Sequence, residues 1–433
     1  MRISQQIVKG KKRREFIEKW INGVLEAGVA TLIQEFKMTP FEVPLDECTY
    51  FLKNPDKNRY PNVGCLDRTR FVLQGDDNFY IHANYVKICD RKNRFLCTQG
   101  PLPSTVNDFW RMTVSAGAEF IVMLCALIEN GVSKCYKYYP DPGEEVETEN
   151  FKISNEGAVE LPTLSVQSKD RVIQQKFKIF VKNENRAVRV SHVQWSNWPD
   201  HGLPDSCETP LRILSLIRKS MQPIIVHCSA GVGRTGTLVF VESLIMALRY
   251  PKKQNPKNAF VQLRKDRAKC IQTLHQFVYA HRCVLEYCFS KKHKKNEEKW
   301  EKFKEDYAQF MSKKKKNDNK GKKKKCSASL SADEIIDPNT ALTTTTTTTT
   351  TTVANSTTPS PSPSVKVNVD ETAEIANPSK GLLVKDEAEQ TPDNSASSNT
   401  PLKAPQQPTD SPFPDGDKEI NDDEEPCSNL DPN

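Results

Sequence analysis

The sequence has 433 residues, 37% hydrophobic and 27% charged, which is enough for one large folded core or two smaller ones. It contains no apolar run of about 18 residues and no apolar stretch near its first residue, which argues against a transmembrane segment and a signal peptide. Its 13 cysteines form no Cys-x-x-Cys pair. The cysteine pattern therefore predicts neither a metal site nor a disulfide framework, and it favours a reducing cytoplasmic location.

The net charge of +7 conceals an asymmetry along the chain. Residues 327–433 hold five lysines, no arginine and 19 acidic residues, so the rest carries an excess of about 21 positive charges. A basic body with an acidic tail predicts anionic substrates or surfaces for the body.

Elements can be predicted in chain order from the spacing of apolar residues. Residues 1–14 form a basic extension, and a spacing of three or four from Phe16 to Phe36 predicts a helix with one apolar face. Strands are expected at 70–73, 80–86, 95–98, 120–124, within 172–195 and at 223–227. Further helices are expected at 105–115, 209–220, 234–249, 256–267 and 273–289. Helices followed by a mixed sheet and more helices predict an α/β domain over residues 15–290.

The composition changes after residue 290. Residues 291–326 hold 16 lysines against six acidic residues, and aromatic residues recur from Trp300 to Phe310 at helical spacing. An amphipathic helix is expected here, which either docks on the domain or binds an anionic surface, with nuclear import as a further reading of the lysine runs. Residues 327–433 are rich in Ser, Thr, Pro and Asp and are predicted to be a disordered tail.

The most informative motif is the loop at 227–236, which reads His-Cys-Ser-Ala-Gly-Val-Gly-Arg-Thr-Gly and follows a short apolar run. Its glycines allow backbone amides to turn toward an anion, and the helix that follows adds the positive end of its dipole. Arg234 can bind two phosphoryl oxygens together. The same positive field favours the thiolate of Cys228, so the loop predicts a nucleophilic cysteine beside a dianion site. A buried structural cysteine beside a surface turn is the alternative.

Five further blocks accompany this loop in the chain. They read Lys-Asn-Arg-Tyr at 57–60, Tyr-Ile-His-Ala-Asn at 80–84, Thr-Gln-Gly-Pro-Leu-Pro at 98–103, Trp-Pro-Asp at 198–200 and Ile-Gln-Thr at 271–273. In this order the chain resembles a cysteine-dependent, phosphotyrosine-specific protein tyrosine phosphatase of the non-receptor type with a single catalytic domain. The resemblance implies that family's fold, a highly twisted mixed β-sheet flanked by helices, and hydrolysis of phosphotyrosine without a metal or cofactor.

The resemblance also implies the roles of the catalytic residues. Cys228 would attack phosphorus to give a phosphocysteine, with Arg234 binding the phosphoryl oxygens. A tyrosyl oxygen needs a proton to leave, and Asp200 is implied as the general acid and later the general base. Gln272 is implied to position the hydrolytic water, and Thr235 to donate its hydroxyl to the departing thiolate.

Other residues are implied to support this chemistry. His227 would orient the loop, Trp198 would stiffen the flank of the acid loop, and Glu129 would hold the plane of Arg234. Lys134 would contact the acid loop, and Gln276 would assist Gln272 in binding.

Substrate binding is assigned to the loop and to an aromatic wall. The wall is Tyr60, which would make the pocket too deep for phosphoserine. The loop residues implied to bind phosphate are Ser229, Ala230, Gly231, Val232 and Gly233. Asn62 stands where the family usually has aspartate, and it would weaken peptide binding by about 1 kcal/mol. His82 stands where the family usually has asparagine, which affects one structural hydrogen bond. Lys269 stands where some members have glycine and a second aryl-phosphate groove, and the lysine would narrow that groove or favour acidic substrates.

Two other classes of function are compatible with parts of the sequence. A phosphatase that has lost activity would act as a phosphotyrosine-binding module, but such proteins usually lack the cysteine, the arginine or the acid. A scaffold that binds nucleic acid through the lysine runs is disfavoured, because aromatic stacking platforms are not interleaved with those runs. The predicted partners are therefore phosphotyrosine-containing proteins, in the cytoplasm or also the nucleus.

Overall fold

The computed structural model describes residues 2–162, 169–198, 202–290 and 296–324, with side chains described from residue 10 to residue 313 within these ranges. The chain divides into a unit Met1–Ile335 and a unit Ile336–Asn433. The second unit and the predicted tail lie outside the described residues. The helices are α1 Arg2–Met38, α2 Thr49–Lys53, α3 Val106–Ser115, α4 Glu208–Ile217, α5 Arg234–Arg249, α6 Ala259–Asp266, α7 Leu274–Ser290 and α8 Glu297–Lys324. The strands are β1 Ala83–Ile88, β2 Arg91–Thr98, β3 Phe120–Met123, β4 Ile128–Glu129, β5 Val132–Ser133, β6 Glu145–Glu147, β7 Phe151–Leu161, β8 Val172–Val181, β9 Arg186–Trp195 and β10 Ile224–His227.

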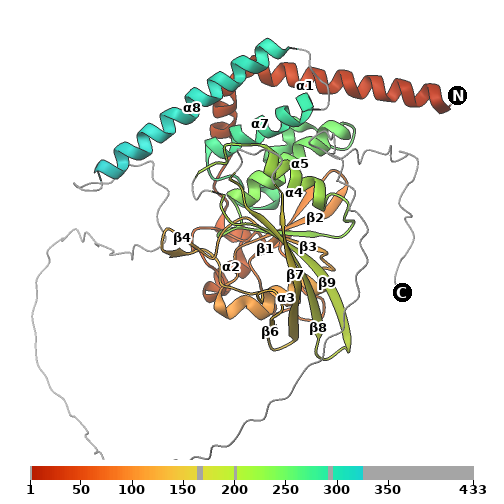
Figure 1. The fold of residues 1–433 in the computed structure, drawn as a ribbon, viewed down its shortest axis with the longest axis vertical. Coiled ribbons are helices and arrows are strands. Elements are labelled where there is room, and N and C mark those ends of the chain that lie inside the picture. The colour runs from red at the N-terminus through yellow and green to blue at the C-terminus, as the bar shows by residue number, and fades with distance from the viewer. Residues whose placement is uncertain (1, 163–168, 199–201, 291–295, 325–433) are drawn as a thin grey trace, which may run out of the picture. The chain divides into compact units, whose positions relative to one another are not determined.

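Eight strands form one mixed sheet in the order β1-β2-β10-β3-β9-β8-β7-β6. Strand β10 runs parallel to β2 and β3, and all of its residues are buried, as expected of an apolar strand inside a sheet covered on both faces. His227 ends β10 opposite Thr98 on one side and Met123 on the other. The predicted mixed sheet flanked by helices is therefore confirmed, and the loop after β10 emerges from the middle of the sheet (Figure 1).

Helix α5 passes through the core behind that loop. All of its residues except Met246 and Arg249 are buried, which fits a helix with apolar residues all round. It packs on α6 and α7, and α1 packs on α7 and α8. Figure 1 shows α1, α7 and α8 together at one end of this unit. Because α5 is packed on all sides, its first residue, Arg234, has a fixed place.

The helix α8 follows the gap at 291–295 and turns its aromatic residues toward the domain. Trp300, Phe303 and Tyr307 are buried. The Trp300 ring stacks on Phe289 of α7 with 5.1 Å between centroids, and Phe310 stacks on His275 at 4.5 Å. Lysines of α8 also face α1: Lys299, Lys302 and Lys313 border a cavity between the two helices, and Lys299 pairs with Glu26 of α1 at 2.8 Å.

Some predicted elements differ from those observed. The segment 70–73 is not a strand and makes only an isolated bridge from Arg70 to Asn84, because the turn at Gly75 ends the extended run before a ladder can form. Helix α1 starts earlier than predicted and contains a kink at Gly28, whose φ of 66° is outside the helical range. The hairpin β4–β5 and strand β7 were not predicted, because their polar residues mask the alternation that marks a strand.

Candidate active site

The loop 228–233 joins β10 to α5 and surrounds the sulfur of Cys228. The cysteine side chain is nearly buried, and the amide of Gly231 points at its Sγ from 3.3 Å. Gly231 has φ of 69°, and a Cβ there would lie 1.9 Å from the carbonyl oxygen of Thr98. Only glycine fits this position, because a side chain would clash with the β2 backbone and strain the left-handed conformation. Glycine at position 231 thus allows the loop to lie against the carboxyl end of β2 with the Gly231 amide facing the sulfur.

Arg234 begins α5 and is held by the hairpin β4–β5. Its two Nη atoms donate to the two carboxylate oxygens of Glu129, each at 2.6 Å, and Nη1 also donates to the carbonyl of Leu124 at 3.0 Å. Burial would lower the pKa of Arg234, but the hydrogen bonds and charge of Glu129 outweigh it and hold that pKa above its ordinary value. The guanidinium therefore has a permanent charge in one plane, as predicted from the sequence for this pair.

His227 lies beneath the loop within a buried chain of hydrogen bonds. Burial lowers its pKa to about 4, so the ring is neutral near pH 7. Its Nδ1 lies 3.2 Å from the carbonyl oxygen of Cys228, an acceptor, so Nδ1 carries the proton and Nε2 accepts from the Tyr138 hydroxyl at 2.8 Å. The Tyr138 oxygen can then accept from His192 Nε2 at 2.9 Å. A neutral ring with both nitrogens engaged is suited to orienting the loop, not to donating protons to a substrate.

Tyr60 reaches the loop from a segment far away in the sequence. Its hydroxyl lies 2.7 Å from Oγ of Ser229, the residue after the nucleophile. The loop is also held at Val232, whose carbonyl accepts a hydrogen bond from the amide of Ile271 at 2.9 Å. Asn62, two residues after Tyr60, is exposed. The Tyr60 side chain therefore contacts the loop at the residue after Cys228, and its role as a wall stays a prediction.

Two glutamines lie on the other side of the loop. A Cβ at Gly233 would come within 2.4 Å of Gln272 Oε1 and 3.1 Å of Gln276 Nε2, so both side chains lie against the loop. Gln276 is buried, and its Oε1 accepts from the amides of Gln272 and Thr273 at 3.0 and 3.3 Å. Gln276 therefore fixes the backbone that carries Gln272.

Four predicted site residues are placed less completely or lie outside the described residues. Thr235 is buried with no hydrogen-bond partner for its hydroxyl among the described residues, so the predicted bond to the sulfur is not observed. Lys134 follows β5 and is half-buried. Trp198 is buried, with its ring 4.7 Å from that of Trp195. Asp200 lies outside the described residues, together with 199 and 201.

A sequence profile described as protein-tyrosine phosphatase matches residues 54–286. The chain belongs to the protein-tyrosine phosphatase family. The tyrosine-protein phosphatase non-receptor type 20 of Mus musculus is 38% identical over 240 residues, which are 54% of this chain and 54% of that protein. The non-receptor type 4 protein of Mus musculus is 33% identical over 55% of this chain and 26% of its own length. The chain thus matches about half or less of the length of these two curated relatives.

Solved structures of this phosphatase family are similar as well. The structure described as PTPN18 in complex with HER2-pY1248 phosphor-peptides superposes with a TM-score of 0.50 and 30% identity, over 54% of this chain and 88% of that chain. The similarity therefore concerns the domain that contains Cys228 and Arg234, and not the lysine-rich segment or the tail.

Besides Tyr138, a second residue near the Cys228 loop was missed from the sequence. Arg267 is fully buried after α6, and its guanidinium donates to the carbonyls of Gly231 at 3.3 Å and Ala230 at 3.1 Å. The same group donates to Asn84 Oδ1 at 2.7 Å. By binding the carbonyls from outside, Arg267 turns the opposite ends of those peptide groups, the amides, toward the anion site. Its sequence signal was weak, because an arginine near a helix end usually lies in solvent.

Two departures from the family pattern have structural partners. His82 is buried, its Nε2 lies 2.7 Å from the carbonyl of Val63, and burial followed by the charge of Arg267 lowers its pKa to about 3. Lys269 directs its Nζ to Glu42 at 3.1 Å, over the ring of Phe41. The lysine charge is thus paired within the chain, which weakens the predicted preference for acidic substrates.

Proposed function

We propose that this chain hydrolyses phosphotyrosine on proteins through a phosphocysteine on Cys228. The observation that carries the proposal is the pairing of Arg234 with Glu129 at the opening of α5, directly after a loop whose amide faces the cysteine sulfur. A planar cation and inward amides form a site for the three terminal oxygens of a phosphate. The sulfur lies at the base of that site, where a thiolate can attack phosphorus in line with the leaving group.

In the first step, the Cys228 thiolate attacks phosphorus and the bond from phosphorus to the tyrosyl oxygen breaks. The leaving oxygen takes a proton from Asp200, so free tyrosine side chain and phosphocysteine result. Arg234 and the loop amides stabilise the charge that gathers on the equatorial oxygens. The family resemblance is the support for Asp200.

In the second step, water attacks the phosphocysteine and the sulfur leaves as a thiolate. Asp200, now a carboxylate, accepts the proton of the water, and Gln272 positions that water. The place of the Gln272 side chain against Gly233 supports this role. Thr235, whose buried hydroxyl has no partner among the described residues, remains available to donate to the departing thiolate.

The substrate class follows from Tyr60, which lies beside the Cys228 loop. The phenol ring of Tyr60 beside Ser229 favours an aryl phosphate that can pack on it and reach the sulfur. The structural relative PTPN18 is described with phosphopeptides, which supports phosphotyrosine-containing proteins as partners. The exposed amide Asn62 would bind the substrate backbone without a charge, so peptide affinity would be lower by about 1 kcal/mol than with aspartate.

Variants of two residues test the proposal. Cys228→Ser should abolish turnover of a phosphotyrosyl peptide while the protein stays folded, because serine is a far weaker nucleophile. Asp200→Ala should bind the peptide but slow its turnover by about 10² to 10⁴-fold, the usual contribution of a general acid. A purified chain that binds the peptide without any turnover would instead be an inactive binding module. A chain that binds nucleic acid and no phosphopeptide would be a scaffold.

The remaining predictions concern the regions beyond the phosphatase site. We propose a catalytic domain over 15–290. We also propose that 291–326 binds a surface of anionic character, for which the 16 lysines of that segment are the support. Lys299, Lys302 and Lys313 line a cavity of about 570 Å³ between α1 and α8. None of the helices in the described ranges has the length and apolar character that crossing a bilayer requires. Cytoplasmic and nuclear location stay predictions, which imaging of the full chain would check.

A further inference from the structure

The segment Lys57–Tyr60 is fastened to the domain residue by residue. Gln99 accepts from the amide of Arg59 at 2.9 Å and donates to the carbonyl of Lys57 at 2.8 Å. The Arg59 guanidinium donates to the carbonyls of Gly100 and Pro101 at 2.9 and 2.7 Å. Since Tyr60 is the last residue of this segment, the segment determines where the phenol ring lies.

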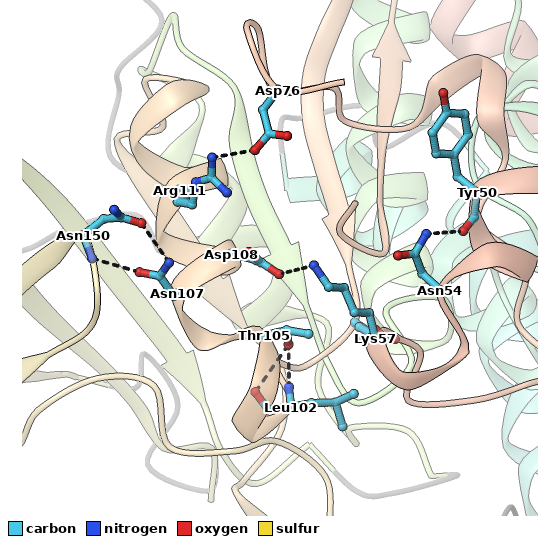
Figure 2. Close-up of polar contacts among 11 residues, drawn as sticks. Tyr50, Asn54, Lys57, Asp76, Leu102, Thr105, Asn107, Asp108, Arg111 and Asn150 are labelled. Carbon is cyan, nitrogen blue, oxygen red and sulfur yellow. Dashed lines mark hydrogen bonds and ion pairs between the residues drawn. The ribbon is translucent and has the colours of Figure 1, made fainter. Parts of the chain in front are cut away.

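One contact joins this segment to a helix. Lys57 Nζ lies 2.9 Å from Asp108 Oδ2, in the first turn of α3 (Figure 2). The carboxylate side chain is 13% exposed and the lysine 34%, so the pair is shielded on the side of the acid. An acidic side chain is also favourable at this end of a helix. Loss of Lys57 would leave the shielded Asp108 carboxylate without its partner, so the pair constrains the segment.

Other contacts also fix α3. Asn107 exchanges two hydrogen bonds with Asn150, at 2.8 and 3.2 Å. Arg111, one turn further, pairs with Asp76 at 2.8 Å. Figure 2 shows these partners coming from different parts of the chain to consecutive turns of α3. Helix α3 is therefore held in place by several contacts, and Lys57 is attached to it through Asp108.

The inner side of α3 contacts the support of the nucleophile. Trp110 Nε1 donates to the carbonyl of Tyr138 at 3.0 Å, and the Tyr138 hydroxyl bonds His227. The ring of Phe109 lies edge-on to His227 with centroids 5.9 Å apart. One helix thus contacts both the residue before Cys228 and the segment that ends in Tyr60.

We propose that Lys57 and Asp108 are positioning residues that set the distance between the Tyr60 wall and the Cys228 loop through α3. This inference rests on the proposed function. When the pair is lost, the 57–60 segment shifts relative to the loop. A substrate ring that must contact Tyr60 then binds less well, whereas a bare phosphate, which contacts only the loop, binds as before.

The experiment compares a substrate that has a ring with a ligand that has none. The full chain and its variants are assayed for the KM of a phosphotyrosyl peptide and the inhibition constant of inorganic phosphate. Lys57→Met and Asp108→Asn should each raise the KM about tenfold, equivalent to about 1.4 kcal/mol, and change the phosphate constant less than about twofold. Lys57→Arg, which restores the charge, should bring the KM back to within about threefold.

A matched pair on the same helix provides the control. Arg111→Met and Asp76→Asn break another ion pair of α3, whose side chains are 31% and 34% exposed and which joins the helix to Asp76 instead of to the 57–60 segment. These variants should leave the ratio of the two constants unchanged. The inference is overturned if KM and the phosphate constant rise together, or if the control variants raise the KM as much. Asp108→Asn keeps the side-chain shape and serves even if Lys57→Met does not fold. An unaltered chain without turnover would overturn the proposed function itself.

Discussion

At the scale of single residues, the site depends on the buried ion pair of Arg234 and Glu129, whose hydrogen bonds hold the two side chains in one orientation. The side chains of Arg234 and Glu129 are 6% and 10% exposed, so water cannot replace a lost partner. Breaking a buried pair is costly because the remaining charge is left without compensation. The same contact that stabilises the fold here also orients the group that we propose to bind phosphate.

Glu129→Gln should therefore lower kcat/KM for a small aryl phosphate by at least about tenfold, or about 1.4 kcal/mol. The amide nitrogen would face a guanidinium N–H, so one of the two hydrogen bonds is replaced by repulsion and the plane of Arg234 tilts. Steady-state kinetics measure the change.

The control for this variant is Glu242→Gln. Glu242 of α5 also accepts two hydrogen bonds from one arginine, from Nε and Nη2 of Arg218 at 3.0 and 2.6 Å, directly after α4. Its loss should reduce the free energy of unfolding without a comparable effect on kcat/KM. Equal kinetic losses in the two variants would contradict a specific role for Glu129.

At the scale of elements, the loop is supported from behind by the end of α6. Arg267 reaches two loop carbonyls and Asn84 of β1, and so joins a helix, a strand and the loop at one buried point. Each carbonyl that it binds lies on the outside of the loop. The inward direction of the amides is therefore a property of this assembly and not of the loop sequence alone.

Arg267→Met should raise the inhibition constant of inorganic phosphate about tenfold or more, because the unsatisfied carbonyls would let the loop relax. Arg94→Met is the comparison. Arg94 is also buried and bonds the carbonyls of Ser220, Ile217 and Arg218, away from the loop. That variant should lose stability but keep phosphate binding, and an unchanged phosphate constant in Arg267→Met would contradict the role given to Arg267.

The sequence predicted those parts of the site that are contiguous and missed those that the fold assembles. The Cys228 loop could be predicted because strand, glycines, arginine and helix follow one another within a few residues. The pair of Arg234 and Glu129 was predicted only through the family resemblance, since 104 residues separate them. Arg267 and Tyr138 could not be predicted, because their roles depend on which carbonyl or ring the fold brings to them. The false strand at 70–73 shows the converse, an apolar run beside β1 in which only Arg70 forms a bridge to Asn84 before the turn at Gly75.

At the scale of the whole molecule, four buried histidines couple stability to pH. Burial lowers the pKa of His82 and His192 to about 3 and that of His227 and His281 to about 4. Between these values and the ordinary pKa of about 6.5, the unfolded chain binds protons that the folded chain excludes. Stability from these histidines is thus complete above about pH 6.5 and is lost as the pH falls toward 4.

Denaturant unfolding at pH 7, 6 and 5 should measure this coupling. Each buried histidine should cost about 2 kcal/mol at pH 5 relative to pH 7, because its unfolded form is protonated and its folded form is not. His281→Gln removes one such group and should make the pH dependence shallower by about one proton. A free energy of unfolding that is constant from pH 7 to pH 5 would contradict the neutral, buried state of these rings.

The central claim is that the phosphoryl group passes through the sulfur of Cys228. Rapid acid quenching of the purified chain during turnover of a phosphotyrosyl peptide, followed by peptide mass spectrometry, tests this most directly. We predict a phosphorylated peptide that contains Cys228, absent from Cys228→Ser and present in Asp200→Ala. Turnover of the substrate with no phosphate on Cys228, or with equal turnover by Cys228→Ser, would contradict the account.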